Sequence, residues 1–294
     1  MKVNVEETLK AADITDWTPI LVYSEVLEGA RRPLVFLEVC KEDFSLIGKD
    51  GHTLHVPKAT QLSAGEDTET NVASGISASD KTISSVTIQP TNIIYSAVEL
   101  TDYLLEDFGS LDLVRLHLRN MGSAVMEKLD GNIRDVLAAG YGVLYTEASN
   151  MDYDTVSTAL ATMEENSWMV DPNTPPFLIV NPMSAATMAQ DTKFIETPRF
   201  YASDPSRLLG EAGMYSECRV LKTSLLANTG NAYIVFPPDY KFGPSVILAW
   251  KRKIRVKSER YENKEITYFI TTIRAKSGVV QAYGVCRINI QTTP

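Results

Sequence analysis

Residues 110–140 read SLDLVRLHLRNMGSAVMEKLDGNIRDVLAAG, and their apolar side chains recur every three or four positions. Ser110 precedes the first apolar residue and Gly140 follows the last, as is typical of a helix start and a helix end. The spacing predicts one amphipathic helix over 110–139, about 45 Å long at 1.5 Å per residue. The residues expected on its apolar face are Leu111, Val114, Leu118, Met121, Val125, Leu129, Ile133 and Val136.

A helix of this length needs a partner along much of its apolar face. A coiled coil is one such partner and a β-sheet is the other. Gly122 and Gly131 lie inside the segment, and the apolar residues keep no strict heptad. These features favour packing against a sheet.

The last third of the chain supplies strands for that sheet. Three β-rich runs, at 246–257, 266–273 and 279–290, are separated by charged or glycine-containing turns. They are expected to pair as an antiparallel meander. With the long helix they predict one unit built from 97–150 and 241–294.

The segment between them, 151–240, alternates helical and strand patterns. Helices are expected at 153–168 and 183–190, and the run FLIV at 177–180 is typical of a buried strand. An irregular stretch is expected at 192–213, and further strands at 219–222 and 232–236. The pattern predicts an α/β unit inserted into the first unit, so the fold class is α+β.

The first 96 residues have little core-forming sequence. A helix is expected at 19–30, with Thr18 as its N-cap, inside an arm of residues 1–44. Residues 45–96 are rich in Ser, Thr, Gly and Asp, with short alternating apolar bursts that predict a long, thin β-hairpin. Loops this long are uncommon in compact domains unless they have a partner, and another chain is the expected one.

Charged residues of opposite sign stand out in two places. The middle of the hairpin segment carries an acidic cluster, Glu66, Asp67 and Glu69, which alternatively is only a solvated loop tip. Strand periodicity puts a basic stripe on one face of the run 246–257. The stripe consists of Lys251, Lys253, Arg255 and Lys257.

The basic stripe is expected to meet an acidic partner. Nucleic acid is one candidate, but three glutamates follow the stripe between 259 and 265, and the net charge of the chain is -9. A protein partner is favoured, and the hypothesis is that the stripe contacts the acidic cluster of a neighbouring subunit. The alternative is a solvated strand face balanced within one subunit.

The sequence shows no pattern typical of catalysis, and no catalytic, metal or cofactor-binding residue is predicted. His52 and His55 are three apart, which on a strand directs them to opposite faces. The three cysteines are far apart and form no CxxC pair, and no phosphate-binding glycine motif is present. The apolar residues form no membrane-spanning run, and the acidic start of the chain does not resemble a signal peptide, so a soluble, unexported protein is expected.

Four segments, in this order, resemble the major capsid proteins of tailed double-stranded DNA viruses, which have the Hong Kong 97-like fold. They are GHTLHVP at 51–57, IYSAVEL at 94–100, PFLIVNP at 176–182 and GVCRINI at 284–290. The resemblance implies an N-terminal arm (1–44), an extended loop (45–96), a peripheral domain (97–150 and 241–294) around a spine helix (110–139), and an axial domain (151–240).

The resemblance also implies a function. A protein of this family assembles with itself, as pentamers and hexamers, into an icosahedral shell around double-stranded DNA, in the host cytoplasm during assembly and in the virion afterwards. Scaffolding, portal and decoration proteins are further partners, DNA contact is independent of sequence, and no membrane or cofactor is involved. An encapsulin-like nanocompartment shell is the alternative, and a soluble α/β enzyme is the less favoured one.

Overall fold

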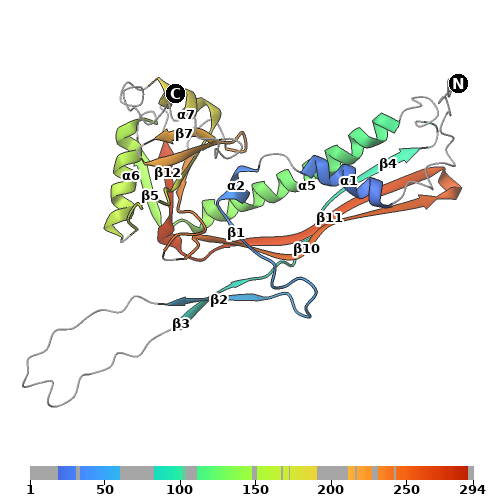
Figure 1. Ribbon diagram of the computed structural model, residues 1–294, viewed down its shortest axis with the longest axis horizontal. Coiled ribbons are helices and arrows are strands. Elements are labelled where there is room, and N and C mark those ends of the chain that lie inside the picture. The colour runs from blue at the N-terminus through green and yellow to red at the C-terminus, as the bar shows by residue number, and fades with distance from the viewer. Residues whose placement is uncertain are drawn as a thin grey trace, which may run out of the picture.

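The computed structural model describes residues 19–30, 34–59, 83–101, 103, 111–147, 151–166, 168–171, 173–190, 211–215, 217–226, 231–241 and 243–290. Two sheets form an elongated body, and a two-stranded hairpin extends away from it (Figure 1). The long helix α5 (Leu111–Gly140) runs along one sheet and reaches the second sheet with its C-terminal end. The α+β expectation and the long helix at 110–139 are thus confirmed.

The first sheet has the order β1-β10-β11-β4. It contains β1 (Lys41–Asp43), β10 (Val246–Tyr261), β11 (Ile266–Val279) and β4 (Ile94–Thr101). β11 pairs antiparallel with both β10 and β4. Its side chains alternate between buried and half-buried positions, and Phe269 and Ile273 face the core beneath α5. The alternation shows that one face of this sheet is covered by the helix.

The apolar face of α5 follows the predicted spacing until its last turn. Val114, Leu118, Val125 and other predicted positions are buried, but in the last turn Leu137 is buried and Val136 is only half-buried. A straight helix drifts relative to a seven-residue repeat, so Leu137 continues the buried line four residues after Ile133. The helix packs on a sheet, as expected, and not in a coiled coil.

Helix α1 (Pro19–Ala30) crosses α5 in backbone contact. A Cβ atom added to Gly122 would lie 2.0 Å from the carbonyl oxygen of Val26, and one added to Gly29 would lie 2.0 Å from that of Arg119. Glutamates of α1 flank the crossing: Arg119 Nε donates to Glu25 at 2.8 Å, and its Nη2 donates to Glu28 at 2.9 Å. Gly122 is therefore required by a second helix, and not by the sheet.

The second sheet has the order β5-β12-β9-β6-β8-β7. Its strands are β5 (Val143–Glu147), β12 (Val285–Ile290), β9 (Asn231–Val235), β6 (Phe177–Val180), β8 (Cys218–Lys222) and β7 (Glu211–Tyr215). Helix α6 (Tyr153–Glu165) packs on one face, and α7 (Pro182–Ala189) follows β6. Phe177 and Ile179 face the opposite way, into the core under α5, so the two units share one core.

Two sequence expectations for this region are wrong. The run 279–290 does not continue the meander, because its strand β12 joins the second sheet, parallel to β5 and antiparallel to β9. The 151–240 segment does not close by itself, because β5 and β12 complete its sheet. The chain crosses between the sheets at a short 3-10 helix (Ala282–Gly284), where a Cβ atom on Gly284 would lie 2.8 Å from the Trp168 ring.

The hairpin consists of β2 (Leu54–Ala59) and β3 (Ile83–Ile88), which pair antiparallel. Within its described residues, the hairpin contacts the body near its base, where Ile88 is 2% exposed and packs with Leu46 and Ile247. Gly278 leaves room for Ile88, since a Cβ atom there would lie 2.7 Å from it. The predicted hairpin is thus packed on the body at its base, and its strands extend away from the two sheets (Figure 1).

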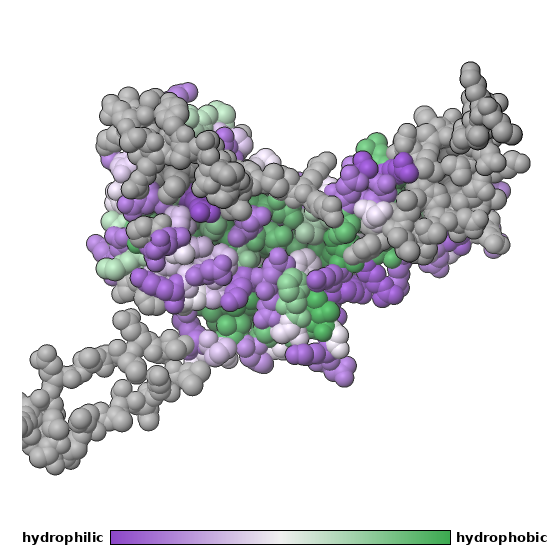
Figure 2. All heavy atoms as spheres, in the orientation of Figure 1, coloured by the Kyte–Doolittle hydropathy of each residue, from purple (hydrophilic) through white to green (hydrophobic). Residues whose placement is uncertain are grey.

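The short helix α2 (Val35–Glu38) leads from the arm towards this hairpin and rests on α5. Asp130, on α5, is 3% exposed and accepts the backbone N–H of Leu37 at 3.0 Å, with further bonds from Val35 and Phe36. Burial raises the pKa of the Asp130 carboxyl to about 6. Figure 2 shows an apolar area around α2 and the adjoining part of α5, bordered by hydrophilic residues.

Candidate functional site

Three members of the predicted basic stripe project from the first sheet. Lys253, Arg255 and Lys257 are exposed, whereas the residues between them, Ile254 and Val256, turn inward and pack against the core under α5. The alternation places the three cations on the face of the sheet that α5 does not cover.

Lys251, the fourth member, is bound within its own subunit. Its ammonium group donates to the backbone carbonyls of Leu46, Lys49 and Gly51, in the loop between β1 and β2. A carbonyl oxygen accepts hydrogen bonds but carries no full negative charge, so the charge of Lys251 stays uncompensated. Lys251 therefore fixes the loop that leads into the hairpin.

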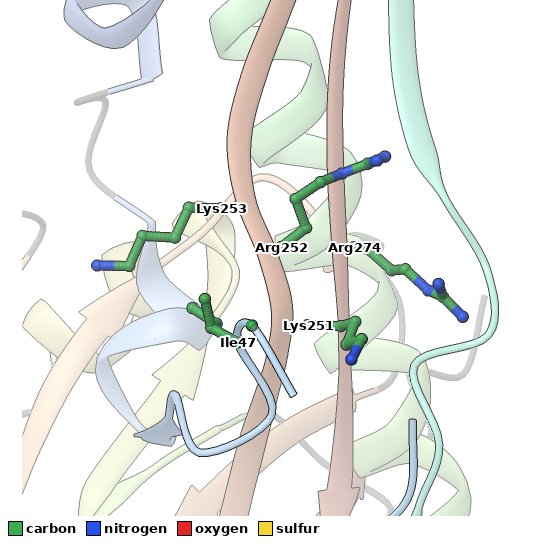
Figure 3. A pocket seen from close by; sticks show the side chains of 6 residues that line it. Ile47, Lys251, Arg252, Lys253 and Arg274 are labelled. Atoms are coloured by element: carbon green, nitrogen blue, oxygen red, sulfur yellow. The ribbon is translucent and has the colours of Figure 1, made fainter. Parts of the chain in front are cut away.

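The simple alternation expected for the stripe is interrupted. The pairing of β10 with β11 shifts between Trp250 and Arg252 and again between Arg252 and Arg255. At a β-bulge, two residues of one strand lie opposite a single residue of the partner strand. The side chains that follow the bulge therefore point to the other face of the sheet than simple alternation predicts. Arg252 consequently pairs with Arg274 of β11 and lies near Lys251 and Lys253 (Figure 3). Nothing in the sequence marks these bulges, and the two arginines were missed for that reason.

The acidic cluster that the hypothesis pairs with the stripe, Glu66, Asp67 and Glu69, lies outside the described residues. The described part of the hairpin ends at Ala59 on one side and resumes at Ile83 on the other. The contact between the stripe and the cluster therefore stays a prediction.

The described part of the chain contains no group of three His, Cys, Asp or Glu side chains suited to a metal ion. The three thiols are buried, and burial raises their pKa values, that of Cys286 to about 12. Such thiols are protonated and unreactive at neutral pH. Within the same ranges, no helix combines the length and apolar character that crossing a membrane requires.

Replacing Lys251 by methionine is expected to loosen the loop between β1 and β2, because three carbonyls lose a charged donor. We expect a loss of about 1 kcal/mol in the free energy of unfolding and faster amide exchange across residues 44–53. Lys276→Met, at an exposed lysine of the same sheet, is the matched control. Hydrogen exchange read by mass spectrometry checks this, and unchanged exchange in Lys251→Met would contradict the role of the lysine.

Comparison with known proteins gives the same fold. The chain has 12% identity and a TM-score of 0.67 to the capsid protein of cyanophage P-SCSP1u, covering 90% of each chain. It has 16% identity and a TM-score of 0.64 to a protein of Mycobacterium phage Che8, covering 88% of this chain and 92% of the other. The SrpI encapsulin of Synechococcus elongatus PCC 7942 has 9% identity and a TM-score of 0.61, covering 86% of each. No curated protein matches by sequence.

A family model described as phage capsid protein matches residues 94–288, which is more than half of the chain. The matched region runs from β4 through the long helix and the second sheet to β12. It covers the elements that carried the resemblance to the Hong Kong 97-like fold, apart from the hairpin. The expected fold is confirmed, and the chain belongs to the phage capsid protein family as a shell-forming major capsid protein of the virion.

Proposed function

We propose that this capsid protein assembles with copies of itself into rings of five and six that close an icosahedral head around double-stranded DNA. The observation that carries the proposal is the hairpin β2–β3, which extends away from the body and, in its described residues, packs on the body near its base (Figure 1). An isolated two-stranded hairpin is marginally stable in water, so it needs a surface to lie on. A neighbouring copy supplies that surface in a shell.

The parts of the chain have distinct roles in this proposal. Residues 1–44 and 45–96 act as an arm and an extended loop that reach neighbouring copies. The first sheet and α5, within 97–150 and 241–294, form a peripheral domain, and 151–240 forms an axial domain around the five-fold and six-fold axes, completed by β5 and β12 from the flanking segments. The two separate sheets support this division, and the shared core under α5 joins the two parts into one building block.

The basic stripe is proposed as a contact between copies. Arg255 and Lys257 are exposed and have no carboxylate within 4.0 Å in the described ranges. The hypothesis keeps Glu66, Asp67 and Glu69 of a neighbouring hairpin as their partner, with Lys253 at the near end of the stripe. Complementary charges speed the encounter of two copies and fix their alignment at the interface, and a shell built from many weak interfaces requires both.

Reversing two charges of the stripe is expected to weaken assembly. Arg255→Glu combined with Lys257→Glu turns the proposed attraction into repulsion and should raise the protein concentration needed for assembly about tenfold at low salt. Lys264→Glu with Lys276→Glu changes the net charge equally at two exposed lysines outside the stripe. Light scattering against concentration measures the difference, and equal behaviour of the two double variants would refute the contact.

Contact with DNA is proposed to be independent of sequence and weak for each copy. The chain has a net charge of -9, so it cannot neutralise many phosphates, and enclosing the genome does not require it to. No catalytic step, metal or cofactor belongs to this function. Scaffolding, portal and decoration proteins are the further partners that it implies.

The similarity to an encapsulin favours one alternative, a nanocompartment shell that encloses protein. Electron microscopy and sedimentation of the purified protein test assembly: closed shells or rings of five and six are expected, and a monomer at every concentration would contradict it. Analysis of particles recovered from the native source separates the alternatives. Double-stranded DNA inside supports the capsid, whereas a protein cargo without nucleic acid supports the compartment.

A further inference from the structure

A hollow of about 450 Å³ lies between the loop after β1 and the bulged part of β10 (Figure 3). Its lining combines two loop residues with four cationic ones. We call it the cationic pocket, and it is formed by Ile47, Gly48, Lys251, Arg252, Lys253 and Arg274.

The four positive charges of the pocket have no negative partner in the described part of the chain. Lys251 and Arg274 donate to backbone carbonyls, Arg274 to that of Pro90 at 2.6 Å, and Lys253 Nζ lies 4.5 Å from the centre of the Phe44 ring. Arg252 and Arg274 are direct cross-strand partners, an arrangement of like charges that destabilises a sheet. Arg252 Nε is buried without a hydrogen-bond partner. Within the described residues the positive charge of this surface is therefore uncompensated, and a partner with carboxylates would neutralise it.

The shape of the pocket indicates the kind of partner. The cationic side chains leave the strands in different directions, so their charged ends do not converge on one point (Figure 3). A single small anion cannot contact them together. Long cationic side chains cover apolar surface with their stems while keeping their charges in water, and Ile47 is 37% exposed among them. The pocket thus fits an apolar side chain that has carboxylates around it.

An exposed apolar side chain surrounded by carboxylates is present on the same chain, directly after helix α6. Met169 is 59% exposed, and Glu164, Glu165 and Asp171 lie within five residues of it, the two glutamates exposed. Tyr240 donates its hydroxyl to the Met169 carbonyl at 2.5 Å, and the Trp168 ring stacks on Tyr240. We call these residues the acidic knob. Its base is rigid, which lowers the entropy lost when it binds.

The electrostatics of the knob are negative on balance. Burial raises the pKa of Tyr240, and the charges of Asp171 and Glu164 raise it further. One cation lies nearby, since Lys241 Nζ is 5.8 Å from the centre of the Tyr240 ring. Three carboxylates against one ammonium group leave the knob complementary to the pocket.

We propose that the acidic knob of one copy inserts Met169 into the cationic pocket of the next copy. The proposal rests on the proposed function and names one contact within it. Because knob and pocket are different surfaces of one chain, the contact is heterologous, and a heterologous contact generates a ring when its rotation closes. This agrees with the rings of five and six.

Cysteine cross-linking tests the contact. Ile47→Cys and Met169→Cys, combined in one chain, place an accessible thiol on each surface, while the native cysteines are buried and do not compete. Mild oxidation, or a short bismaleimide, applied to assembled particles should give a ladder of covalent multimers on a denaturing gel. Each single variant, carrying one new thiol, is the control and should give no ladder beyond a dimer. Particles of the double variant that assemble and remain monomeric on the gel would overturn the contact.

A charge exchange provides a second test that does not depend on thiols. Glu164→Lys with Glu165→Lys is expected to raise the assembly concentration several-fold, and Arg252→Glu, at a pocket residue outside the basic stripe, to do the same. Combined, the three changes set one negative position of the pocket against two positive positions of the knob, while the other three cations keep the pocket positive. The assembly concentration should therefore fall part of the way back towards that of the wild type. A combined variant that assembles no better than its two parts would overturn the pairing of these surfaces.

The two proposals fail in different ways. Wild-type protein that forms no ring or shell refutes the proposed function, whatever the variants do. Wild-type shells without cross-links or charge rescue refute only the contact between knob and pocket, and then leave the pocket to another partner. Circular dichroism of each variant before assembly shows whether a loss comes from unfolding.

Discussion

Gly122→Ala should lower the free energy of unfolding by about 3 kcal/mol, although alanine favours helices more than glycine does. The added Cβ atom would lie 2.0 Å from the Val26 carbonyl oxygen and 3.1 Å from the Ala30 nitrogen. Both are backbone atoms of α1, so no side-chain rotation relieves the overlap, and α1 must move away from α5. Urea unfolding followed by circular dichroism measures the loss.

Gly131→Ala is the matched control on the same helix. A Cβ atom at Gly131 would meet nothing within 4 Å, so only the helix propensity changes. We expect this variant to be about 0.5–1 kcal/mol more stable than the wild type. If the two alanine variants were equally stable, the close crossing of α1 and α5 would be wrong.

Substitution of Asp130 is expected to have the second large effect on the free energy of unfolding. Asp130→Leu has as many side-chain heavy atoms, although it is bulkier, and leaves the Leu37 N–H and its neighbours in α2 without their acceptor. Unpaired buried donors are expensive, so this variant should be about 3 kcal/mol less stable than Asp130→Asn, which keeps an oxygen there. Thermal unfolding at pH 7 compares the two, and equal stability would contradict the role of Asp130 as a hydrogen-bond acceptor for α2.

The pH dependence of stability tests the same carboxyl group. Its pKa is about 6 in the folded chain and 3.8 as the reference for the unfolded chain, because burial disfavours the charged form. Between these values the folded chain binds more protons, so the contribution of Asp130 falls as pH rises from about 4 to 6 and is lost above pH 6. Asp130→Asn should remove that part of the slope, and a slope identical to that of the wild type would contradict the raised pKa.

Local patterns in the sequence predicted the local elements well. The helix at 19–30 matches α1, and the helix at 110–139 matches α5 to within a residue at each end. The antiparallel pair β10–β11 and the hairpin β2–β3 were also expected. Each of these depends on periodicity and turns within a continuous stretch, which a single sequence contains.

Pairing between distant segments was not predictable in the same way. β5 and β12 are parallel neighbours separated by more than 130 residues, and neither carries a mark of its partner. The short elements β1, α2 and β7 were missed because three to five residues show no measurable periodicity. The second sheet therefore contains β12, which had been predicted as a strand of the first unit, and β5, whose residues had been placed in that unit without a predicted strand.

The candidate site was predictable only in part. Alternation gave the exposed face of Arg255 and Lys257, because β10 pairs regularly from Arg255 onwards, and Lys253, which lies in the second register shift, is exposed as well. The internal role of Lys251 and the approach of Arg252 to Arg274 both follow from register shifts, which depend on the partner strand and the neighbouring loop. Charge patterns alone indicate that a partner is needed but not which side chains meet it.

A cryo-electron microscopy reconstruction of particles assembled from the purified protein tests the central claim most directly. We expect closed shells in which the chain surrounds five-fold and six-fold axes, with residues 151–240 nearest the axes and each β2–β3 hairpin lying on a neighbouring copy. Open polymers, or shells in which every hairpin lies on its own subunit, would contradict the account.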